Sequence, residues 1–388
     1  MFSRTAEARL HRLARGFPVL VLTGPRQSGK TTLARSSFPR HAYVSLEDPD
    51  VRQRVAADPR GFLASHRDRG VVLDEAQRLP ALLSYLQTAV DADRRPGRFI
   101  VTGSQNLLLT AAVTQSLAGR AAYQELMPLS YTEGAAVFDK LSLDELLLRG
   151  AYPAVHAGGI DCNDWHASYV ASYLERDVRQ LSRIGDLLQF QRFLRMMAAR
   201  CGQLLNLNAV AHDLGVAQTT VHDWLAILEA TYVAFRLAPY HVNFGKRLVK
   251  TPKLYFHDTG LAAWLLGIRD AATMNVHPMR GALFENLCIA EYGKHLRHAG
   301  GTATAWFWRD NIGNEVDLLL DQGGVLQPVE FKSGATFQPA WIHSLQTWQR
   351  HAAAARQTEP LLVSAAPGNQ RMQGVGVVHW RDALLALR

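Results

Sequence analysis

An apolar segment followed by a glycine-rich loop stands near the start of the chain. Residues 18–22 read Pro-Val-Leu-Val-Leu, which predicts a buried strand, and residues 24–31 read Gly-Pro-Arg-Gln-Ser-Gly-Lys-Thr. This is the G-x-x-x-x-G-K-[ST] phosphate-binding pattern in the setting it requires, between a strand and a helix. The glycines let backbone N–H groups surround a phosphate chain, and the N-terminus of the following helix favours negative charge. A chance glycine-rich turn before a helix is the alternative, which the flanking segments disfavour.

The residue types of this loop predict a site for a nucleoside triphosphate, with ATP and Mg²⁺ as the expected cofactors. We expect Lys30 to reach the β- and γ-phosphates and the Thr31 hydroxyl to bind Mg²⁺. The residues predicted to bind the nucleotide are Gly24, Pro25, Arg26, Gln27, Ser28, Gly29, Lys30, Thr31 and Thr32.

A second apolar segment ends in two acidic residues, in the sequence Gly-Val-Val-Leu-Asp-Glu-Ala-Gln over residues 70–77. We expect Asp74, at the end of this strand, to position the Mg²⁺, as the equivalent Asp does in P-loop enzymes. Glu75 is placed to activate the attacking water, because a general base must lie within hydrogen-bond reach of the proton it takes. A buried strand that merely ends in solvated acids is the alternative. The phosphate-binding loop disfavours it, because that loop needs a carboxylate partner.

Together with Thr-Gly-Ser-Gln at residues 102–105, these motifs resemble the AAA-type ATPases that carry a C-terminal domain of unknown function. Residues 173–178, 253–261 and 281–286 resemble the same family, so the likeness covers nearly the whole chain. With the patterns described below, it implies an α/β fold in three domains. These are a P-loop ATPase domain of the ASCE or AAA+ type over residues 1–140, a helical winged-helix domain over 141–275, and an α/β restriction-endonuclease-like domain over 276–388.

The resemblance also implies two further residues at the ATPase site. In AAA+ proteins the strand that lies between the two strands above ends in a polar residue that senses the γ-phosphate, and Ser104 is the candidate, with Gln105 and Thr102 as alternatives. Arg120 matches an arginine that often enters the neighbouring subunit's site, where it would stabilise charge on the transferred phosphoryl group. This role implies a homo-oligomer, for which a hexameric ring is the expected form. An intramolecular salt bridge or a solvated helix end is the alternative for Arg120.

Composition and charge limit the remaining possibilities. The chain has 388 residues, of which 48% are hydrophobic and 20% charged, as in ordinary globular proteins. No segment approaches the ~18 consecutive apolar residues of a membrane span. The pattern of Met1–Gly16 predicts a short amphipathic helix and lacks the features of a signal peptide. The three cysteines have no metal-type spacing, which predicts a reducing compartment and a cytoplasmic location. The net charge of +8 favours a polyanionic partner such as DNA.

Residues 208–229 have a helix-turn-helix pattern, with a short helix, a turn at Gly215 and a second amphipathic helix. The segment 231–237 is rich in β-branched and aromatic residues and would open a winged hairpin. The second helix would display polar groups that read bases weakly, namely Gln218, Thr219, Thr220, His222 and Asp223. Cations that could bind phosphates follow as Lys246, Arg247, Lys250 and Lys253. DNA contact and a purely structural role between domains or subunits both remain open.

From about residue 279 the sequence pattern changes to α/β. A predicted helix over 284–297 carries Glu285, a strand over 315–320 carries Asp317, and a strand after the Gly-Gly turn at 323–324 carries Glu330 and Lys332. This arrangement is similar to the PD-(D/E)XK nuclease core, and most similar to that of archaeal-type Holliday junction resolvases. Residues i and i+2 of a strand face the same way, so Glu330 and Lys332 should converge on one site.

Glu285, Asp317 and Glu330 are the predicted ligands of a second Mg²⁺ or Mn²⁺, beside which Lys332 adds positive charge. A solvated ion pair on an edge strand is the alternative for the Glu-x-Lys pattern. Even with its carboxylates, such a domain could serve only as a DNA clamp or an assembly platform.

Three functions are therefore open. The first is a Mg²⁺-dependent ATP hydrolase that couples ATP to DNA binding or processing, with metal-dependent cleavage by the C-terminal domain left open. The second is an ATP-gated regulator or scaffold that binds DNA or protein and has no nuclease activity. The third is an ATPase that acts on proteins, whose binding to DNA would be absent or insensitive to salt.

Overall fold

The computed structural model describes residues 2–103, 117–174, 187–240, 251–301, 304–352 and 355–387. The chain divides into two compact units. The first contains Met1–Leu129, Ala230–Tyr232 and Arg297–Gly300, and the second contains Ser130–Glu229, Val233–Leu296 and Gly301–Arg388. The second unit thus holds both the middle and the C-terminal segments, and the division into three domains stays a prediction. Within the described part of the chain, no helix has the length and apolar character needed to cross a membrane.

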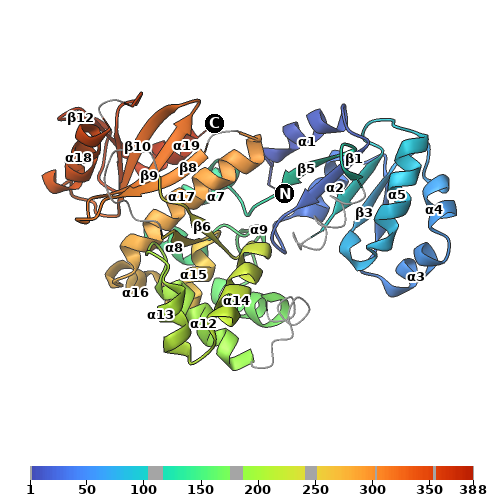
Figure 1. Ribbon diagram of the computed structural model, residues 1–388, viewed down its shortest axis with the longest axis horizontal. Coiled ribbons are helices and arrows are strands. Elements are labelled where there is room, and N and C mark those ends of the chain that lie inside the picture. Colours follow the sequence, from blue (N-terminus) through green and yellow to red (C-terminus); the bar gives the residue numbers. More distant parts are fainter. Residues whose placement is uncertain are drawn as a thin grey trace. The chain divides into compact units, whose positions relative to one another are not determined.

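The first unit is built on a parallel sheet (Figure 1), whose strand order is β2-β3-β4-β1-β5. Its strands are β1 (Val19–Thr23), β2 (Ala42–Ser45), β3 (Val71–Asp74), β4 (Phe99–Thr102) and β5 (Ala121–Glu125). β4 pairs with both β1 and β3, as the resemblance to AAA+ ATPases implies. Because all these strands run parallel, their last residues Thr23, Asp74 and Thr102 reach the same edge of the sheet.

Helices cover both faces of this sheet. Successive side chains of β1 point to opposite faces, so its apolar residues need a packing partner on each side. Val19 and Val21 pack in a cluster with apolar residues of α3, α4 and α5, whereas Leu20 and Leu22 pack with α1 and α2. The helices are α1 (Ala6–Ala14), α2 (Lys30–Ser37), α3 (Pro49–Ala57), α4 (Pro59–Ser65) and α5 (Ala81–Ala92), with the 3₁₀ turn η1 (Ala76–Arg78). The predicted amphipathic helix at the N-terminus is confirmed as α1.

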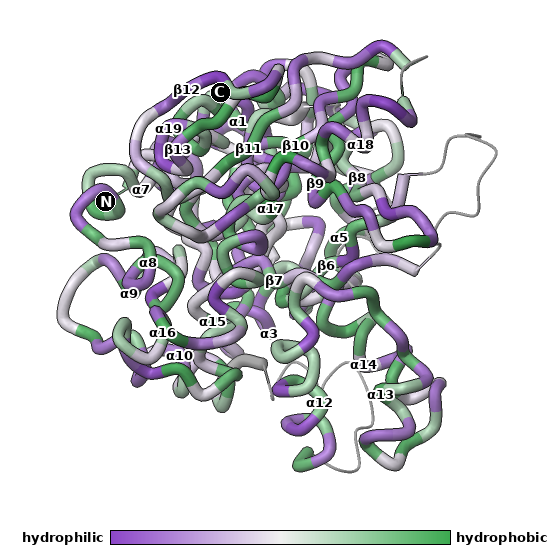
Figure 2. The backbone as a smooth tube through the Cα atoms, turned by 90° about the vertical axis from the view of Figure 1, so that its left-hand side faces the viewer, coloured by the Kyte–Doolittle hydropathy of each residue, from purple (hydrophilic) through white to green (hydrophobic). Residues whose placement is uncertain are grey.

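The second unit is largely helical up to residue 276, as the sequence predicts. Its helices in this part are α7 (Tyr131–Phe138), α8 (Leu143–Arg149), α9 (Pro153–His156), α10 (Cys162–Tyr169), the π-helix η2 (Val170–Leu174), α12 (Leu187–Ala199), α13 (Leu207–Leu214), α14 (Gln218–Ala230), α15 (Thr259–Leu265) and α16 (Ala271–Val276). Figure 2 shows hydrophilic and hydrophobic segments alternating along α12, which buries only one face.

The helix-turn-helix prediction is confirmed by α13 and α14. Gly215 ends α13 in the left-handed conformation, with φ of 68°, which favours glycine at this position. β6 (Ala234–Leu237) and β7 (Lys253–Phe256) then form an antiparallel pair, so the predicted hairpin opens within residues 231–237. Beyond β6, the Tyr240 amide donates to the Phe307 carbonyl at 2.7 Å. This pairing joins the middle segment to the C-terminal sheet.

The C-terminal sheet has the strand order β12-β13-β11-β10-β9-β8. Its strands are β8 (Thr304–Arg309), β9 (Glu315–Gln322), β10 (Val325–Lys332), β11 (Leu361–Ser364), β12 (Gln370–Met372) and β13 (Val375–His379), and its helices are α17 (Arg280–Ala299), α18 (His343–His351) and α19 (Trp380–Ala386), with the 3₁₀ turn η3 (Pro339–Ile342). β10 pairs with β9 on one side and β11 on the other, so the edge-strand alternative for Glu330 and Lys332 is wrong.

Candidate nucleotide site and C-terminal carboxylate cluster

The glycine-rich loop runs from the carboxyl end of β1 to Lys30, the first residue of α2. Gly24 has a φ of 142°, and a Cβ added there would lie 2.2 Å from the carbonyl oxygen of Leu126. Gly29 caps α2 with a φ of 96°. Only glycine adopts these conformations readily, and at Gly24 only glycine fits the space. The glycines of the motif are therefore required by the backbone path of the loop.

Lys30 lies folded along this loop. Its Nζ donates to the backbone carbonyls of Gly24 at 3.0 Å and Pro25 at 2.7 Å, and the side chain is buried. The ammonium is thus held beside the backbone that would surround the phosphates. This placement fits the role that the motif predicts for Lys30.

Arg4 stabilises the loop from the N-terminal side, and neither motif nor spacing pointed to it. Its two terminal nitrogens donate to the backbone carbonyls of Ser28 and Met127, each at 2.6 Å. Arg4 is itself buried. A charged donor that binds two carbonyls fixes the loop against the segment that follows β5.

Asp74 accepts hydrogen bonds from three hydroxyl groups. Thr31 Oγ1 lies 2.9 Å and 3.1 Å from its two carboxylate oxygens, Tyr43 donates to Oδ2 at 2.8 Å, and Thr102 donates to Oδ1. Burial, followed by the hydrogen bond to Asp74, raises the pKa of Tyr43 to about 12, so its hydroxyl stays protonated near neutral pH. Thr31 and Asp74 are thus close together, as their predicted binding of one Mg²⁺ requires, and Thr102 is the alternative sensor residue. No sequence motif pointed to Tyr43.

The residues present fit a magnesium ion beside a nucleotide. Thr31 and Asp74 bring a hydroxyl and a carboxylate together at the carboxyl edge of the sheet. Such hard oxygen donors, completed by phosphate oxygens and water, are those that Mg²⁺ prefers.

Glu75 has an uncommon backbone conformation. Its φ of 56° lies in the left-handed region, which is sparsely populated by residues other than glycine and often marks functional sites. Gln77 donates to the Glu75 carboxylate, and the Glu75 amide donates to Thr102 Oγ1 at 3.4 Å. The side chain is therefore held immediately beyond Asp74. Its role in activating water stays a prediction.

The two residues implied by the AAA+ resemblance have different outcomes. Ser104, like its alternative Gln105, lies outside the described residues. Arg120 forms a two-point ion pair with Asp91, with contacts of 2.7 Å and 2.9 Å, and the hydrogen bonds from Arg120 lower the pKa of Asp91. Arg120 directly precedes β5 and lies at the amino edge of the sheet, opposite the loop that contains Lys30. The intramolecular salt bridge is thus present, and a role in a neighbouring subunit stays a prediction.

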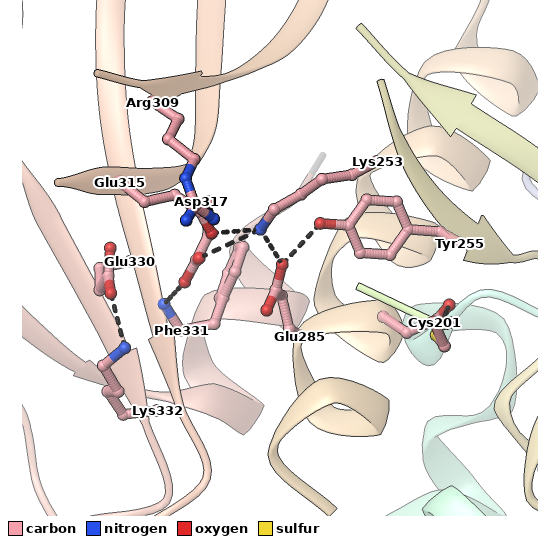
Figure 3. Close-up of polar contacts among 11 residues, drawn as sticks. Cys201, Lys253, Tyr255, Glu285, Arg309, Glu315, Asp317, Glu330, Phe331 and Lys332 are labelled. Atoms are coloured by element: carbon pink, nitrogen blue, oxygen red, sulfur yellow. Dashed lines mark hydrogen bonds and ion pairs between the residues drawn. The ribbon is translucent and has the colours of Figure 1, made fainter. Parts of the chain in front are cut away.

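In the second unit, carboxylates of α17 and β9 surround the ammonium of Lys253 (Figure 3). Lys253 Nζ lies 2.5 Å from Glu315 Oε1, 2.9 Å from Glu285 Oε1 and 3.8 Å from Asp317 Oδ1, and the residue is only 2% exposed. Lys253 and Tyr255 project from the same face of β7, and the Tyr255 hydroxyl also donates to Glu285. We call Lys253, Glu285, Glu315 and Asp317 the carboxylate cluster.

The prediction that Lys253 contributes to a phosphate-binding set is wrong, because this side chain is buried against carboxylates. The other members of that set, Lys246, Arg247 and Lys250, lie outside the described residues. Glu315 was not among the predicted site residues, although its i, i+2 spacing with Asp317 on one strand was a visible signal.

Glu330 and Lys332 meet beside this cluster, as their spacing on one strand predicts. Lys332 Nζ lies 2.6 Å from Glu330 Oε1, and Glu330 is buried. Asp317 accepts a hydrogen bond of 2.9 Å from the Phe331 amide, which places it next to the Glu330 position. Burial raises the pKa of Asp317 and Glu330, and burial together with the charge of Asp317 raises the pKa of Glu285 to about 7.

The cluster as folded does not fit a resident divalent metal ion. Among the residues that the structure describes, no group of three or more His, Cys, Asp or Glu side chains is arranged to hold one. The predicted ligands Glu285 and Asp317 do converge, but on an ammonium group, and Glu330 binds Lys332 instead. Sequence patterns did not indicate this arrangement, because Lys253 follows other basic residues that suit a phosphate-binding surface.

The second helix of the helix-turn-helix exposes the polar face that the sequence predicts. Gln218, Thr219, His222 and Asp223 are exposed along α14, and Thr220 is partly so. The apolar positions Val221, Leu225 and Leu228 are buried.

The loop, the strand-end carboxylate and the strand order define a P-loop ATPase of the AAA type. The family described as "AAA domain" matches residues 16–135, and two families described as domains of unknown function, DUF8612 and DUF4143, match residues 140–272 and 280–382. The chain belongs to the AAA-type ATPases that carry a C-terminal domain of unknown function.

Among its relatives is an uncharacterized protein of Mycobacterium tuberculosis, 34% identical over 350 residues that cover 89% of this chain and 76% of that protein. A protein of Mycobacterium bovis has the same identity and coverage. A Walker-type ATPase of Pyrococcus abyssi is similar in structure, with 16% identity, a TM-score of 0.48, and coverage of 68% of this chain and 96% of that one.

Proposed function

We propose that this chain is a Mg²⁺-dependent ATP hydrolase. The observation that carries the proposal is the contact of 2.9 Å between the Thr31 hydroxyl and the Asp74 carboxylate, at the sheet edge from which the phosphate-binding loop leaves. Lys30 would bind the β- and γ-phosphates, and Thr31 and Asp74 would hold the metal ion. When bound, Mg²⁺ neutralises charge that develops on the phosphoryl oxygens.

Glu75 is the proposed general base of this reaction. It follows Asp74 directly, and Gln77 and Thr102 fix its side chain and backbone. A base held in place beside the metal-binding carboxylate can take a proton from a water molecule aimed at the γ-phosphate.

The proposal is tested by phosphate release from ATP in the presence of Mg²⁺. Thr31→Ala removes a hydroxyl that contacts Asp74, whereas Thr88→Ala removes an exposed hydroxyl from α5 and serves as the matched control. We expect Thr31→Ala to lose hydrolysis and Thr88→Ala to retain it. Equal rates in Thr31→Ala and the unmodified protein would contradict the proposal.

For the output of this ATPase, we propose ATP-gated DNA binding without cleavage. The polar face of α14 is exposed and the chain carries a net charge of +8, both of which suit a duplex. The buried Lys253 among the carboxylates disfavours metal-dependent cleavage.

A contact of Tyr232 close to the phosphate-binding loop offers a way for nucleotide binding to affect α14. Ala230–Tyr232, which directly follow the body of α14, belong to the first unit. The Tyr232 hydroxyl lies within hydrogen-bond distance of Thr23 Oγ1, at 3.1 Å, and Thr23 is the residue before Gly24. A nucleotide that favours one arrangement of the loop would therefore bias the segment that leaves α14.

Labelled linear and four-way-junction DNA, incubated with Mg²⁺ or Mn²⁺ with and without ATP, tests this output. We expect binding that weakens as salt rises, no cuts, and loss of the ATP effect in Lys30→Ala. Cuts that disappear in Asp317→Ala would instead establish a metal-dependent nuclease. Absence of DNA binding at any salt concentration would favour an ATPase that acts on proteins.

A further inference from the structure

We infer that Lys253 is the resident cation of the carboxylate cluster, and that it takes the place a divalent metal ion would hold among Glu285, Glu315 and Asp317. The second unit then folds without a metal ion at this position. This inference concerns the second unit alone, so it stands whether or not the first unit hydrolyses ATP.

The distances show that the ammonium occupies the point where the carboxylates converge. Lys253 Nζ contacts oxygens of Glu315 and Glu285 at 2.5 Å and 2.9 Å, and Asp317 lies at 3.8 Å. Mg²⁺ and Ca²⁺ bind oxygen ligands at roughly 2.0–2.6 Å. A metal ion bound by the same oxygens would overlap the ammonium, so the two occupants exclude each other.

The backbone is held by hydrogen bonds at the residues directly before and after Lys253. The Leu205 amide donates to the Pro252 carbonyl at 2.9 Å, and the Gly202 amide donates to the Leu254 carbonyl at 2.8 Å. Farther along β7, the Asn286 side chain accepts from the Phe256 amide at 2.6 Å and donates to its carbonyl at 2.9 Å. Lys253 therefore enters the cluster from a strand that is anchored independently of the ion pairs.

Charge balance makes the lysine necessary to the fold. The Lys253 side chain is 2% exposed, Asp317 is buried with it, and Glu285 is partly buried. Removing one partner of a buried ion pair leaves an uncompensated charge and strongly destabilises a protein. A divalent cation added from solution should then restore the stability of a variant that lacks Lys253, because it supplies the positive charge that the carboxylates lose with the ammonium.

The experiment compares thermal unfolding of the full chain with and without MnCl₂, in the absence of nucleotide. We expect the unmodified protein to show no change in Tm, and Lys253→Met to have a lower Tm that Mn²⁺ raises. Lys294→Met is the matched control: the Lys294 side chain is equally buried, and its ammonium lies 2.7 Å from the carboxylate of Glu291, outside the carboxylate cluster. We expect it to lose stability without rescue by Mn²⁺. Lys253→Met that folds but does not respond to Mn²⁺ would overturn the inference.

A second measurement does not require the Lys253 variant to fold. Bound Mn²⁺ is counted by equilibrium dialysis for the unmodified protein and for Asp317→Asn, again without nucleotide. Glu330 Oε2 is buried and has no hydrogen-bond partner among the described residues. An ion that did bind beside Asp317 would therefore use this oxygen as a ligand. We expect equal counts in the two proteins. An ion bound by the unmodified protein and lost in Asp317→Asn would overturn the inference.

Discussion

The hydroxyl of Thr31 lies 2.9 Å from the carboxylate of Asp74, although 43 residues separate them in the sequence. Thr31 stands in the first turn of α2, and Asp74 is the last residue of β3. Two motifs that the sequence analysis identified separately therefore meet at one edge of the parallel sheet. This meeting defines the candidate ATPase site, and Glu75 follows Asp74 directly.

Replacing Glu75 by glutamine should preserve ATP binding and slow hydrolysis by at least ~10²-fold, the usual contribution of a general base. The amide keeps the size of the side chain but cannot accept the proton from water. Binding of a fluorescent ATP analogue and phosphate release measure the two effects. Glu47→Gln, at an exposed position of the same unit, is the control and should leave turnover unchanged. Near-normal turnover in Glu75→Gln would show that another group activates the water.

Replacing Tyr232 by phenylalanine should separate ATP hydrolysis from its effect on DNA affinity. The variant loses the hydroxyl that bonds to Thr23 at 3.1 Å and Glu125 at 3.0 Å, while the loop itself is intact. We expect hydrolysis close to normal and a DNA affinity that no longer depends on ATP, measured by fluorescence anisotropy. Tyr123→Phe, at an exposed position of β5, is the control. An ATP effect that survives in Tyr232→Phe would exclude this route.

The two roles considered for Arg120 predict different mixing behaviour. If Arg120 acts on a neighbouring subunit, Arg120→Ala and Lys30→Ala should each be inactive alone and recover hydrolysis when mixed. The recovery would arise where an intact loop of one subunit meets an intact arginine of the next. If Arg120 serves only its ion pair with Asp91, Asp91→Asn should reproduce the defect of Arg120→Ala, and mixing should restore nothing. Phosphate release and the oligomeric mass, with and without ATP, decide between these outcomes.

The free energy of unfolding of the second unit should decrease as the pH falls below about 6.5, because His166 is buried. This residue of α10 is 1% exposed, and its ring packs edge-on against Trp165 with 5.0 Å between centroids. Burial lowers the pKa of His166 below its ordinary value of 6.5. As the pH falls, the unfolded chain therefore takes up a proton before the folded one does. The stabilisation is complete above the unfolded pKa and is lost as the pH falls towards the folded one.

Urea unfolding at roughly pH 7 and pH 5, on either side of the ordinary titration range of histidine, checks this prediction. We expect His166→Phe to lose less stability between the two pH values than the unmodified protein does. His222→Phe, at an exposed position of α14, should keep the full difference. An unchanged pH dependence in His166→Phe would assign the effect to other groups.

The sequence by itself determined the nucleotide-binding site of the first unit. Its loop, strand and carboxylate form local patterns, because a phosphate chain and Mg²⁺ demand fixed residue types at fixed spacings. The helix-turn-helix was likewise visible in its apolar pattern and glycine turn, and the strands that carry Asp317 and Glu330 were visible on either side of their Gly-Gly turn. In each of these cases the determining interactions lie within a short stretch of chain.

Only the tertiary structure decided how the polar side chains pair. The position of Tyr43 on Asp74, the ion pair of Arg120 with Asp91, and the placement of Lys253 against Glu285 all join residues from different elements. A lysine in a sequence carries the same charge whether it faces a phosphate or a buried carboxylate. Its partner is set by strand pairing and helix packing, which bring distant segments together, so the sequence alone assigned Lys253 to the wrong surface.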